Sequence, residues 1–346
     1  MSSLRKEQLI SAFKQLGLYL QHPNEALIAV IDSASNSNAW FTSTEVNKAV
    51  KALAEMLDGQ DLAEWFETVE ITSNPKTVGL ILAGNIPLVG FHDVMCVLAT
   101  GNIAQIKLSS SDNKLLPFLL NQLVKILPEL QNHLVYVEQL KNFDAVIATG
   151  SNNTSRYFEY YFGKVPNIIR RNRNSVAILT GSESEAEIEA LGHDILDYFG
   201  MGCRSISKIF IPKNYEIRKF FEPLEQFHDI INHFKYNNNY DYNKSIYLVN
   251  QQAHYDNGFL LLKEDEGLSS PLAVLYYETY GEVKEVAKKL NQQEEQIQCI
   301  VANTAVQHLE VLPFGQSQRP KLWDYADNVN TIAFLNNLAN YLFVFG

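Results

Sequence analysis

The chain is organised around the stretch Gly200-Met-Gly-Cys203-Arg-Ser-Ile-Ser-Lys-Ile-Phe-Ile-Pro212. An amphipathic helical pattern ends at Phe199, and the apolar run Lys208–Ile211 before Pro212 predicts a short buried strand. Cys203 is therefore expected on a turn between a helix and a strand. Two glycines precede it, and glycine adopts backbone angles that other residues avoid and leaves room for a ligand close to the main chain. This context favours a thiol that faces a cleft.

The three cysteines support different interpretations. Cysteine needs the least assistance of any side chain to act as a nucleophile near neutral pH. Cysteine is also among the most buried residue types, so a small core residue stays an open alternative for Cys203. The core interpretation is favoured for Cys96, inside an apolar helix, and for Cys299, inside an apolar strand. An odd number of cysteines without C-x-x-C spacing predicts reduced thiols, no zinc or other metal site, and a cytoplasmic protein.

Length and composition exclude several classes of protein. A chain of 346 residues exceeds what one hydrophobic core usually organises, so two packed units are expected. Hydrophobic residues make up 46%, which argues against disorder. A net charge of -11 argues against a nucleic-acid partner, which requires a concentrated basic surface. No apolar run approaches the length of a membrane span, and no signal peptide is recognisable.

The first half of the chain alternates strands with helices. Residues 1–72 are expected to form a helical segment without chemistry of its own, with a short strand at Val69–Thr72. From residue 73 the alternation predicts right-handed crossovers and a doubly wound parallel sheet. Its expected strands are Val78–Ala83, Ile103–Leu108, Leu134–Val137 and Ala145–Thr149.

Three loops of this predicted sheet are expected to share one crevice, because ligands bind at the carboxyl ends of parallel strands. They are Gly84-Asn85, Lys107-Leu-Ser109 and Thr149-Gly-Ser151. Gly150 and Ser151 open a helix whose first N–H groups suit a phosphate or ribose contact. An ordinary turn with a capping serine remains the alternative there, and a solvated strand end remains the alternative for Lys107. No G-x-G-x-x-G is present, so the usual dinucleotide fingerprint is absent.

The second half is expected to form another α/β unit. The predicted strands are Ser175–Leu179, Ile246–Val249, Leu272–Tyr277 and Ile297–Val301. Ser182 and Glu185 predict a capping box for the helix that leads to Cys203. Tyr236–Tyr242, rich in Asn and Tyr, is expected as an exposed loop. Thr331–Leu335 is a candidate strand before an apolar tail that suits exchange across a dimer.

One basic cluster stands out in this acidic chain. Arg170-Arg-Asn-Arg173 concentrates positive charge near the expected crevice. We expect Arg170, Arg171 or Arg173 to contact the phosphates of coenzyme A or of a dinucleotide. A solvated, salt-paired surface is the more frequent outcome for such clusters and remains the alternative.

Taken in order, these segments resemble the aldehyde dehydrogenase superfamily, and within it the LuxC-type acyl-CoA reductases, from about Lys76 to Leu335. Gly202-Cys203 resembles the turn with the catalytic cysteine, and Ala83-Gly-Asn85-Ile-Pro-Leu resembles the loop whose asparagine helps to form the oxyanion site. Pro313-Phe-Gly315 and Asp324-Tyr-Ala-Asp327 are similar to late segments of the family. The resemblance implies an aldehyde dehydrogenase-like α/β fold with two doubly wound units.

The same resemblance assigns cofactor contacts. Ile106-Lys107-Leu is similar to the strand end whose lysine binds the adenosine ribose, with Ser109 just beyond it. Thr149-Gly150-Ser151 is similar to the cofactor-binding Gly-Ser turn. These matches imply NADP(H) or NAD(H) as cofactor. The family boundary near Arg171 implies a dinucleotide-binding domain at 73–170 and a catalytic domain at 171–325. The apolar C-terminal tail, 326–346, is expected to serve oligomerisation.

Two departures from the family pattern carry information. Arg170 occupies the position of the glutamate that activates water in hydrolytic members, so a thioester on Cys203 should resist hydrolysis and exchange with a thiol such as coenzyme A. Gly267 stands where a glutamate holds the nicotinamide ribose, and Glu266 is one residue out of register. The ribose contact at this position is therefore not assigned.

The resulting expectation is an NAD(P)H-dependent reductase that converts an acyl thioester, such as a fatty acyl-CoA, to an aldehyde through a thioester on Cys203. Coenzyme A is the expected cosubstrate, and an acyl carrier or acyl-transfer protein and a second copy of the chain are the expected partners. Two alternatives remain: a cysteine acyltransferase or thioesterase without hydride transfer, and a non-catalytic relative that serves as a binding module.

Overall fold

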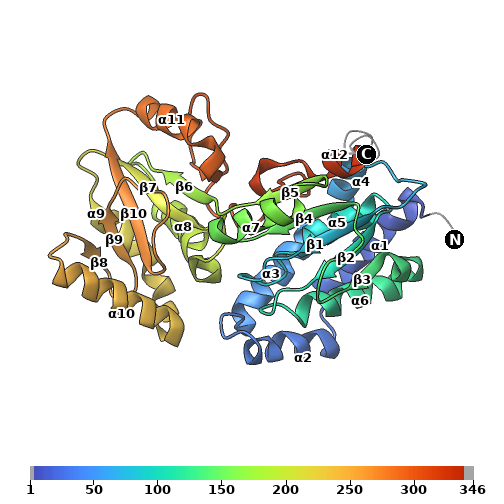
Figure 1. Cartoon of the computed structure of the whole chain (residues 1–346). Helices are drawn as coiled ribbons and strands as arrows, with labels where there is room; N and C mark the ends of the chain where they lie inside the picture. The colour runs from blue at the N-terminus through green and yellow to red at the C-terminus, as the bar shows by residue number, and fades with distance from the viewer. Residues whose placement is uncertain (1–3, 339–346) are drawn as a thin grey trace. The chain divides into compact units, whose positions relative to one another are not determined.

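The computed structural model describes residues 4–338 of the chain. The chain divides into two compact units (Figure 1). The first unit extends to Asn172 and resumes at Arg319, and the second unit is Arg173–Gln318. The boundary falls inside the Arg170–Arg173 cluster. The functional roles expected for residues 73–170 and 171–325 stay predictions.

Four helices open the first unit. They are α1 (Lys6–Gln21), α2 (Glu25–Ser33), α3 (Ser43–Met56) and α4 (Gly59–Glu67). Their buried faces join one apolar core with the sheet that follows: Phe13 and Phe66 belong to the same cluster as Val78 and Leu80. These helices lie within the segment predicted to be helical, residues 1–72, and they are part of the first unit.

The strand predicted at Val69–Thr72 is wrong. This segment leaves α4 as irregular chain, and its backbone finds partners other than a strand. The Thr72 N–H donates to the Thr100 carbonyl at 3.0 Å, and the Glu70 N–H donates to Oδ1 of Asn336 at 3.2 Å. Val69 is buried nonetheless, which explains its apolar character.

The first unit contains a five-stranded parallel sheet in the order β3-β2-β1-β4-β5. Parallel pairing places the carboxyl ends of its strands at one edge, as predicted. The sequence pattern did not mark β5, which contains only two apolar residues. The strands are β1 (Thr77–Ile81), β2 (Ile103–Lys107), β3 (Leu134–Tyr136), β4 (Ala145–Thr149) and β5 (Asn167–Arg170).

Helices cover both faces of this sheet. Helices α5 (Phe91–Ala99) and α6 (Leu115–Ile126) pack in the core that the N-terminal helices share. On the other face, α7 (Asn152–Phe162) packs Phe158 and Phe162 against alternate residues of β4. Side chains alternate between the faces of a strand, so this arrangement is the doubly wound architecture predicted from the sequence.

The strand predicted at Thr331–Leu335 is wrong, because the segment forms helix α12 (Thr331–Asn336). Oδ1 of Asn330 caps it by accepting the Ala333 N–H at 2.8 Å. Ile332 and Leu335, three residues apart, face the core of the first unit, which is the spacing of a helix face. Of the tail expected to serve oligomerisation, residues 339–346 lie outside the described residues.

The second unit contains a six-stranded sheet in the order β11-β6-β7-β10-β9-β8, parallel except for the β8–β9 pair. Two apolar clusters pack on its faces: Ile209 and Ile211 of β7 belong to one, and Phe210 to the other. Its strands are β6 (Asn174–Ile178), β7 (Ile206–Pro212), β8 (Tyr255–Asp256), β9 (Leu261–Glu264), β10 (Val274–Tyr280) and β11 (Ile297–Val301). Its helices are α8 (Glu185–Leu196), α9 (Ile217–Phe221), α10 (Phe234–Val249) and α11 (Val283–Gln292).

Helix α10 overturns two predictions, an exposed loop at Tyr236–Tyr242 and a strand at Ile246–Val249. The whole stretch is one helix, and its buried side chains recur at helical spacing: Tyr236, Tyr240, Asn243 and Tyr247. The Tyr236 hydroxyl donates to the Phe259 carbonyl at 3.1 Å, which satisfies its polar end within the core. Tertiary burial of tyrosine rings therefore outweighs the loop-like composition.

The capping box of α8 lies two residues later than predicted. Ser184 and Glu187 form it: the Glu187 N–H donates to Oγ of Ser184 at 3.3 Å, and the Ser184 N–H donates to Oε2 of Glu187 at 2.8 Å. Glu183 accepts the Gly181 N–H at 3.0 Å and so closes a separate turn before the helix. The predicted pair, Ser182 and Glu185, is wrong because that turn takes up two more residues.

Candidate active site

Cys203 lies on a turn between α8 and β7, as predicted, and its side chain is exposed. The Ser205 N–H donates to the Gly202 carbonyl at 3.0 Å, which closes the turn around Cys203. The Gly202 N–H donates to Oγ of Ser205 at 3.1 Å. Cys203 is thus held at the corner of a hydrogen-bonded frame and is not a core residue.

The chain approaches this turn through a left-handed bend. Helix α8 ends at Leu196, earlier than predicted, and Tyr198, Phe199 and Gly200 follow with φ of 54°, 58° and 74°. Left-handed backbone costs a non-glycine residue roughly 1–2 kcal/mol. Both aromatic side chains are buried, and their packing offsets this cost. The bend reverses the chain directly before the cysteine turn.

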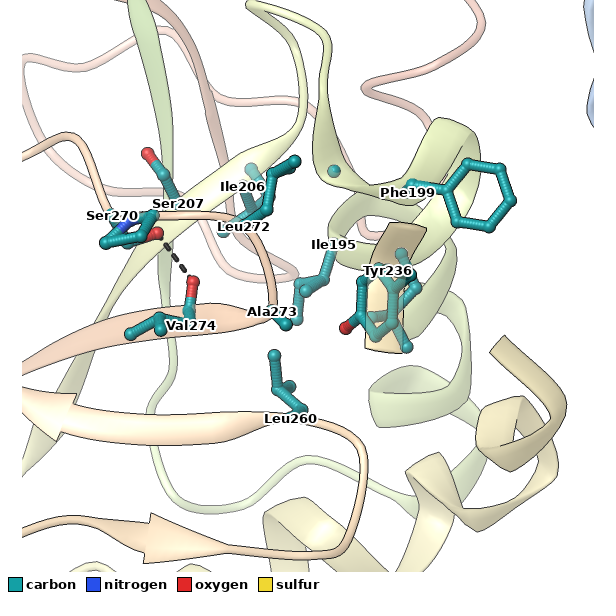
Figure 2. A pocket seen from close by; sticks show the side chains of 13 residues that line it. Ile195, Phe199, Ile206, Ser207, Tyr236, Leu260, Ser270, Leu272, Ala273 and Val274 are labelled. Atoms are coloured by element: carbon teal, nitrogen blue, oxygen red, sulfur yellow. Dashed lines mark hydrogen bonds between the residues drawn. The ribbon is translucent and has the colours of Figure 1, made fainter. Parts of the chain in front are cut away.

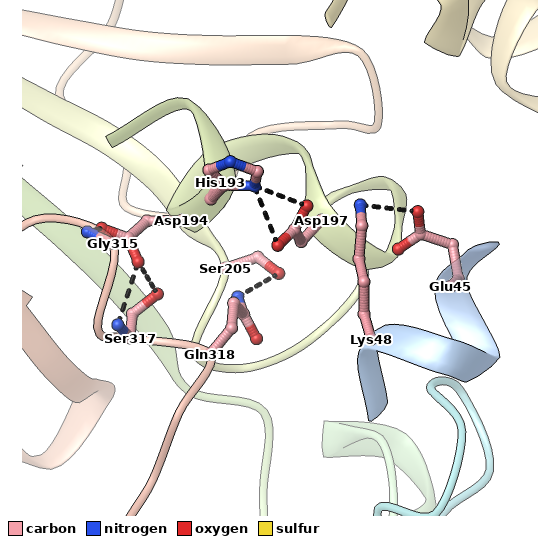
Figure 3. Close-up of polar contacts among 9 residues, drawn as sticks. All are labelled: Glu45, Lys48, His193, Asp194, Asp197, Ser205, Gly315, Ser317 and Gln318. Atoms are coloured by element: carbon pink, nitrogen blue, oxygen red, sulfur yellow. Dashed lines mark hydrogen bonds and ion pairs between the residues drawn. The ribbon is translucent and has the colours of Figure 1, made fainter. Parts of the chain in front are cut away.

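A buried carboxylate anchors the segment that follows Pro313 (Figure 3). Asp194 of α8 accepts the Gly315 N–H at 2.6 Å, the Ser317 N–H at 2.9 Å and the Ser317 hydroxyl at 2.7 Å. Beside them, Nε2 of Gln318 donates to Oγ of Ser205 at 3.2 Å. Segment 315–318 is therefore tied both to α8 and to the cysteine turn.

The ionisation of Asp194 makes the stability of the protein depend on pH. Burial raises the pKa of this carboxyl to about 6, although its hydrogen bonds lower the pKa in part. In the unfolded chain the group ionises near pH 4. Between about pH 4 and 6 the unfolded chain therefore binds fewer protons at this group than the folded protein does. We expect this contribution to stability to fall as pH rises through that window and to stay level above it.

Urea unfolding of the wild type and of Asp194→Asn at several pH values measures this contribution. From pH 4 to pH 7, the unfolding free energy of the wild type should fall, relative to that of Asp194→Asn, by on the order of 3 kcal/mol. A difference that stays constant over this range would contradict the predicted ionisation.

The other two cysteines differ from Cys203 in environment. Cys96 is buried in α5, and burial raises the pKa of its thiol. Burial likewise raises the pKa of the Cys299 thiol on β11 to about 11. Both were predicted to be core residues, and their thiols stay protonated near neutral pH. Cys203 is the exposed member of the three, and none of them forms a disulfide.

A small cavity lies beside the cysteine turn in the second unit (Figure 2). Its volume is about 30 Å³, room for about one water molecule or methylene group. Its lining residues include Gly200 and Ile206, three residues to either side of Cys203. The hydroxyls of Ser207 and Ser270 in the wall donate to the carbonyls of Leu268 at 2.7 Å and Val274 at 2.6 Å. Both hydroxyl protons are therefore committed to the backbone.

The predicted loops of the first unit lie at the carboxyl edge of its sheet. Asn85 follows β1 and is exposed, and Lys107 ends β2 and is exposed. A Cβ on Gly84 would lie 2.4 Å from Oγ of Ser109, so only glycine allows these two loops to touch. Their convergence was predicted from the strand order.

Asp112 holds the Asn85 loop in place, a role that sequence reasoning did not assign. Its buried carboxylate accepts the Leu88 N–H at 3.0 Å and the Leu116 N–H at 3.2 Å. Leu88 has φ of 61°, so the loop follows a strained path that this carboxylate stabilises. The bond to Leu116 caps the first turn of α6, whereas nothing in the sequence signalled the bond to the loop.

Gly150 and Ser151 join β4 to α7. Oγ of Ser151 accepts the Thr154 N–H at 3.3 Å and so caps the helix. A Cβ on Gly150 would lie 2.9 Å from Cε2 of Phe158, which explains the glycine by close packing. The capping alternative is therefore observed, and the contact to a dinucleotide stays a prediction.

The three arginines of the basic cluster have different environments. Arg170 is 3% exposed and forms an ion pair with Asp93, and its Nη2 donates to Oγ1 of Thr331 at 3.1 Å. Arg171 is exposed and pairs with Glu159. Arg173, in the second unit, donates to the Ile297 carbonyl at 3.1 Å. Because Arg170 is buried, its side chain is not accessible to a phosphate group. The predicted phosphate contact is therefore retained only for Arg171 and Arg173.

The segment after β9 contains the residues that depart from the family pattern. Gly267 donates its N–H to Oδ1 of Asp265 at 2.9 Å, and Glu266 is exposed. The carbonyl of Asp265 accepts from the buried ammonium of Lys208 at 2.9 Å. This turn is therefore held by Asp265 and Lys208, and a role of Glu266 toward a ribose stays unassigned.

Two further properties concern residues 4–338 as a whole. No helix in this range has the length and apolar character needed to cross a bilayer. The range also contains no group of three or more His, Cys, Asp or Glu side chains placed to hold a metal ion.

Comparison with solved structures defines the fold. Aldehyde dehydrogenase 21 from Physcomitrella patens, in complex with succinate, matches with a TM-score of 0.65 and 12% identity over 98% of this chain and 85% of that chain. A mutant propionaldehyde dehydrogenase from a Clostridium phytofermentans microcompartment matches with a TM-score of 0.57 and 10% identity over 85% and 76%. A mutant P. syringae indole-3-acetaldehyde dehydrogenase in complex with NAD+ matches with a TM-score of 0.59 and 11% identity over 82% and 69%. The chain has the aldehyde dehydrogenase fold.

A family model matches part of the sequence. Residues 59–228 match the family model described as acyl-CoA reductase (LuxC), and this range includes Asn85, Lys107, Ser151 and Cys203. No curated protein matches the chain. The chain thus has the aldehyde dehydrogenase fold, and residues 59–228, just under half of it, are similar to the LuxC acyl-CoA reductases.

Proposed function

We propose that this protein reduces an acyl thioester to an aldehyde with a nicotinamide dinucleotide as hydride donor. The observation that carries the proposal is the exposed Cys203 on a hydrogen-bonded turn, within the residues that match the LuxC family model. Cys96 is buried and Cys299 is partly buried, and burial raises the pKa of both thiols, so they do not compete for this role. The complex of the similar indole-3-acetaldehyde dehydrogenase with NAD+ supports the choice of cofactor class.

The proposed chemistry begins at Cys203. Its thiolate attacks the carbonyl carbon of the acyl thioester, the bond to the leaving thiol breaks, and the acyl group stays on Sγ of Cys203. The side chain of Asn85 and the N–H of Cys203 are proposed to stabilise the developing oxyanion, at a few kcal/mol for each donor. A bound dinucleotide supplies a hydride to the acyl carbon. Collapse of the resulting hemithioacetal returns the thiolate of Cys203 and releases the aldehyde.

The residues at the carboxyl edge of the first sheet fit a dinucleotide. Lys107 has an exposed side chain, and Ser109 lies against Gly84. Ser151 caps the N-terminus of α7 and follows Gly150. A helix N-terminus and a cation at one sheet edge suit phosphate and ribose groups. We therefore propose Lys107, Ser109, Gly150 and Ser151 as contacts of NADP(H) or NAD(H).

The environment of Arg170 supports reduction over hydrolysis. By the family register, Arg170 stands where hydrolytic relatives have a water-activating glutamate, and here the side chain is buried against Asp93. A guanidinium cannot accept a proton from water near neutral pH. The acyl group on Cys203 is therefore proposed to leave by hydride transfer or by attack of a thiol, with coenzyme A or a carrier protein as the donor thiol.

The test combines purified protein, an acyl-CoA and NADPH or NADH, and follows both nicotinamide absorbance and thiol release. Oxidation of the dinucleotide with formation of aldehyde supports the proposal. Thiol release without oxidation would identify the protein as an acyltransferase or thioesterase. Failure of iodoacetamide to label Cys203 selectively would favour a non-catalytic relative. Homo-oligomerisation and an acyl-transfer partner stay predictions.

Arg171→Ala is expected to weaken the binding of coenzyme A or of NADPH by roughly tenfold, the effect of losing one charge-assisted contact to a phosphate. Arg171 is exposed and its ion pair with Glu159 lies in solvent, so the side chain is accessible to a ligand. Isothermal titration of both ligands measures the effect. Arg218→Ala is the matched control, because Arg218 is also exposed and pairs with Glu222. Unchanged affinities for both ligands would rule the contact out.

A further inference from the structure

Ser175 occupies an irregular point of the second sheet. It lies on β6, is 0% exposed, and pairs with Ile206 of β7. The register of β6 with β7 shifts immediately after Ser175, and the register of β6 with β11 shifts between Ile297 and Ile300. Both neighbouring strands therefore carry an extra residue opposite Ser175, and the regular backbone ladder is interrupted there.

The hydroxyl of Ser175 replaces the missing ladder bonds. Oγ of Ser175 lies 2.8 Å from the Cys203 carbonyl oxygen, 3.2 Å from the Cys299 nitrogen and 3.1 Å from Sγ of Cys299. A carbonyl only accepts and a backbone N–H only donates, so the hydroxyl proton goes to Cys203 and a lone pair of Oγ receives the Cys299 N–H. The remaining lone pair of Oγ receives the Cys299 S–H. This buried hydroxyl is fully satisfied, in one orientation.

These bonds complete the frame around the nucleophile. On the N-terminal side of Cys203, the Gly202 N–H is held by Oγ of Ser205 at 3.1 Å, and the Gly202 carbonyl receives the Ser205 N–H at 3.0 Å. On the C-terminal side, the hydroxyl of Ser175 holds the Cys203 carbonyl. The backbone of Cys203 is thus fixed from both sides, and the direction of its Cα–Cβ bond is fixed with it.

We propose that Ser175 is a positioning residue for Cys203. The role of Cys203 as the nucleophile rests on the proposed function. Its hydroxyl connects the cysteine turn to strand β6 of the sheet and sets the orientation from which Sγ attacks. Removing this bond lets the peptide that follows Cys203 rotate, and the thiol then samples orientations that do not lead to reaction. Misplacement of a reacting group by about 1 Å costs up to about a hundredfold in rate.

The variants Ser175→Ala, Ser175→Thr and Ser175→Cys test this role, with Ser207→Ala as the matched control. Ser207 lies on the adjacent strand, and its hydroxyl is 2.7 Å from the Leu268 carbonyl oxygen and 3.4 Å from the Ser175 carbonyl oxygen. The control therefore removes a neighbouring serine hydroxyl and leaves the bond from Ser175 to the Cys203 carbonyl in place. For each variant, kcat and KM with acyl-CoA and NADPH are measured, together with the rate of iodoacetamide alkylation at Cys203 by peptide mass spectrometry. Thermal unfolding establishes the fraction of folded protein.

We expect Ser175→Ala to lower kcat by roughly ten- to a hundredfold with KM within about twofold of wild type. Ser175→Thr should restore most of kcat, because it keeps the hydroxyl, and Ser207→Ala should keep the wild-type kcat. A lower unfolding temperature with unchanged kcat per folded molecule would overturn the proposal. If Ser175→Ala does not fold, Ser175→Cys decides: wild-type kcat in that variant overturns the proposal, and reduced kcat supports it.

The alkylation rate separates this proposal from the proposed function. Alkylation needs no acyl substrate and no dinucleotide, so it reports the orientation and access of Sγ of Cys203 directly. A wild-type protein without reductase activity would refute the proposed function, whereas a changed alkylation rate in Ser175→Ala would still support the link from Ser175 to Cys203. An alkylation rate equal to that of the wild type would refute the link.

Discussion

Cys203→Ala is expected to lower kcat for acyl-CoA reduction by roughly four orders of magnitude or more, because it removes the group that forms the covalent intermediate. Cys203 is exposed, so the substitution should leave the unfolding free energy within about 0.5 kcal/mol of wild type. Dinucleotide affinity should also stay close to wild type, because the proposed cofactor contacts lie in the other unit. Steady-state kinetics, urea unfolding and titration with NADPH measure the three quantities.

Cys96→Ala is the matched control for this experiment. This variant also removes a thiol, but one that lies in the core of the first unit. We expect it to keep the wild-type activity at a modest cost in stability. In the wild type, iodoacetamide should label Cys203 and leave Cys96 and Cys299 unmodified. Substantial turnover by Cys203→Ala would end the proposed mechanism.

Arg170→Ala is expected to destabilise the first unit by about 3–5 kcal/mol, the usual effect of removing one partner of a buried ion pair. Asp93 would be left in the core without its partner, and Thr331 would lose the donor that reaches it at 3.1 Å. Arg170 thereby connects β5 to α5 and to α12. Urea unfolding followed by tryptophan fluorescence detects the change, because Trp65 lies in the same core.

Two further variants establish the cause of this loss. Arg171→Ala removes an exposed, ion-paired neighbour and should change stability by no more than about 0.5 kcal/mol. The double variant Arg170→Met with Asp93→Leu replaces the pair by apolar side chains, which often restores stability. An Arg170→Ala protein as stable as the wild type would show that the ion pair contributes little to the fold.

Buried carboxylates recur as the groups that hold the loops of this protein. Asp112 connects the Asn85 loop to α6, Asp194 holds the segment at Gly315, and Asp93 holds Arg170. Each lies in the interior, where an unsatisfied charge is costly, and each is therefore matched by donors from distant parts of the chain. The sequence around these aspartates predicts a helix but does not indicate which distant groups they bind.

Local patterns predicted much of the fold correctly. The apolar runs of β1, β2 and β4 mark strands buried on both faces, and Gly101, with φ of 75°, marks the end of α5. The failures share a physical cause, because they occur where a tertiary contact outweighs a local preference. The tyrosines of α10 are buried by packing, and β5 is stabilised by its pairing with β4, although only two of its residues are apolar.

The sequence by itself determined which segments form β1 to β4, the alternation that makes a doubly wound sheet, and the glycine-flanked cysteine on a turn. These depend on periodicity and backbone freedom, which act over a few residues. Only the tertiary structure decided which charges are buried. It placed Arg170 against Asp93, 77 positions apart, and Ser175 against Cys203, 28 positions apart. Such pairs form because an interior polar group must find a partner wherever the fold brings one, and no local pattern records that distance.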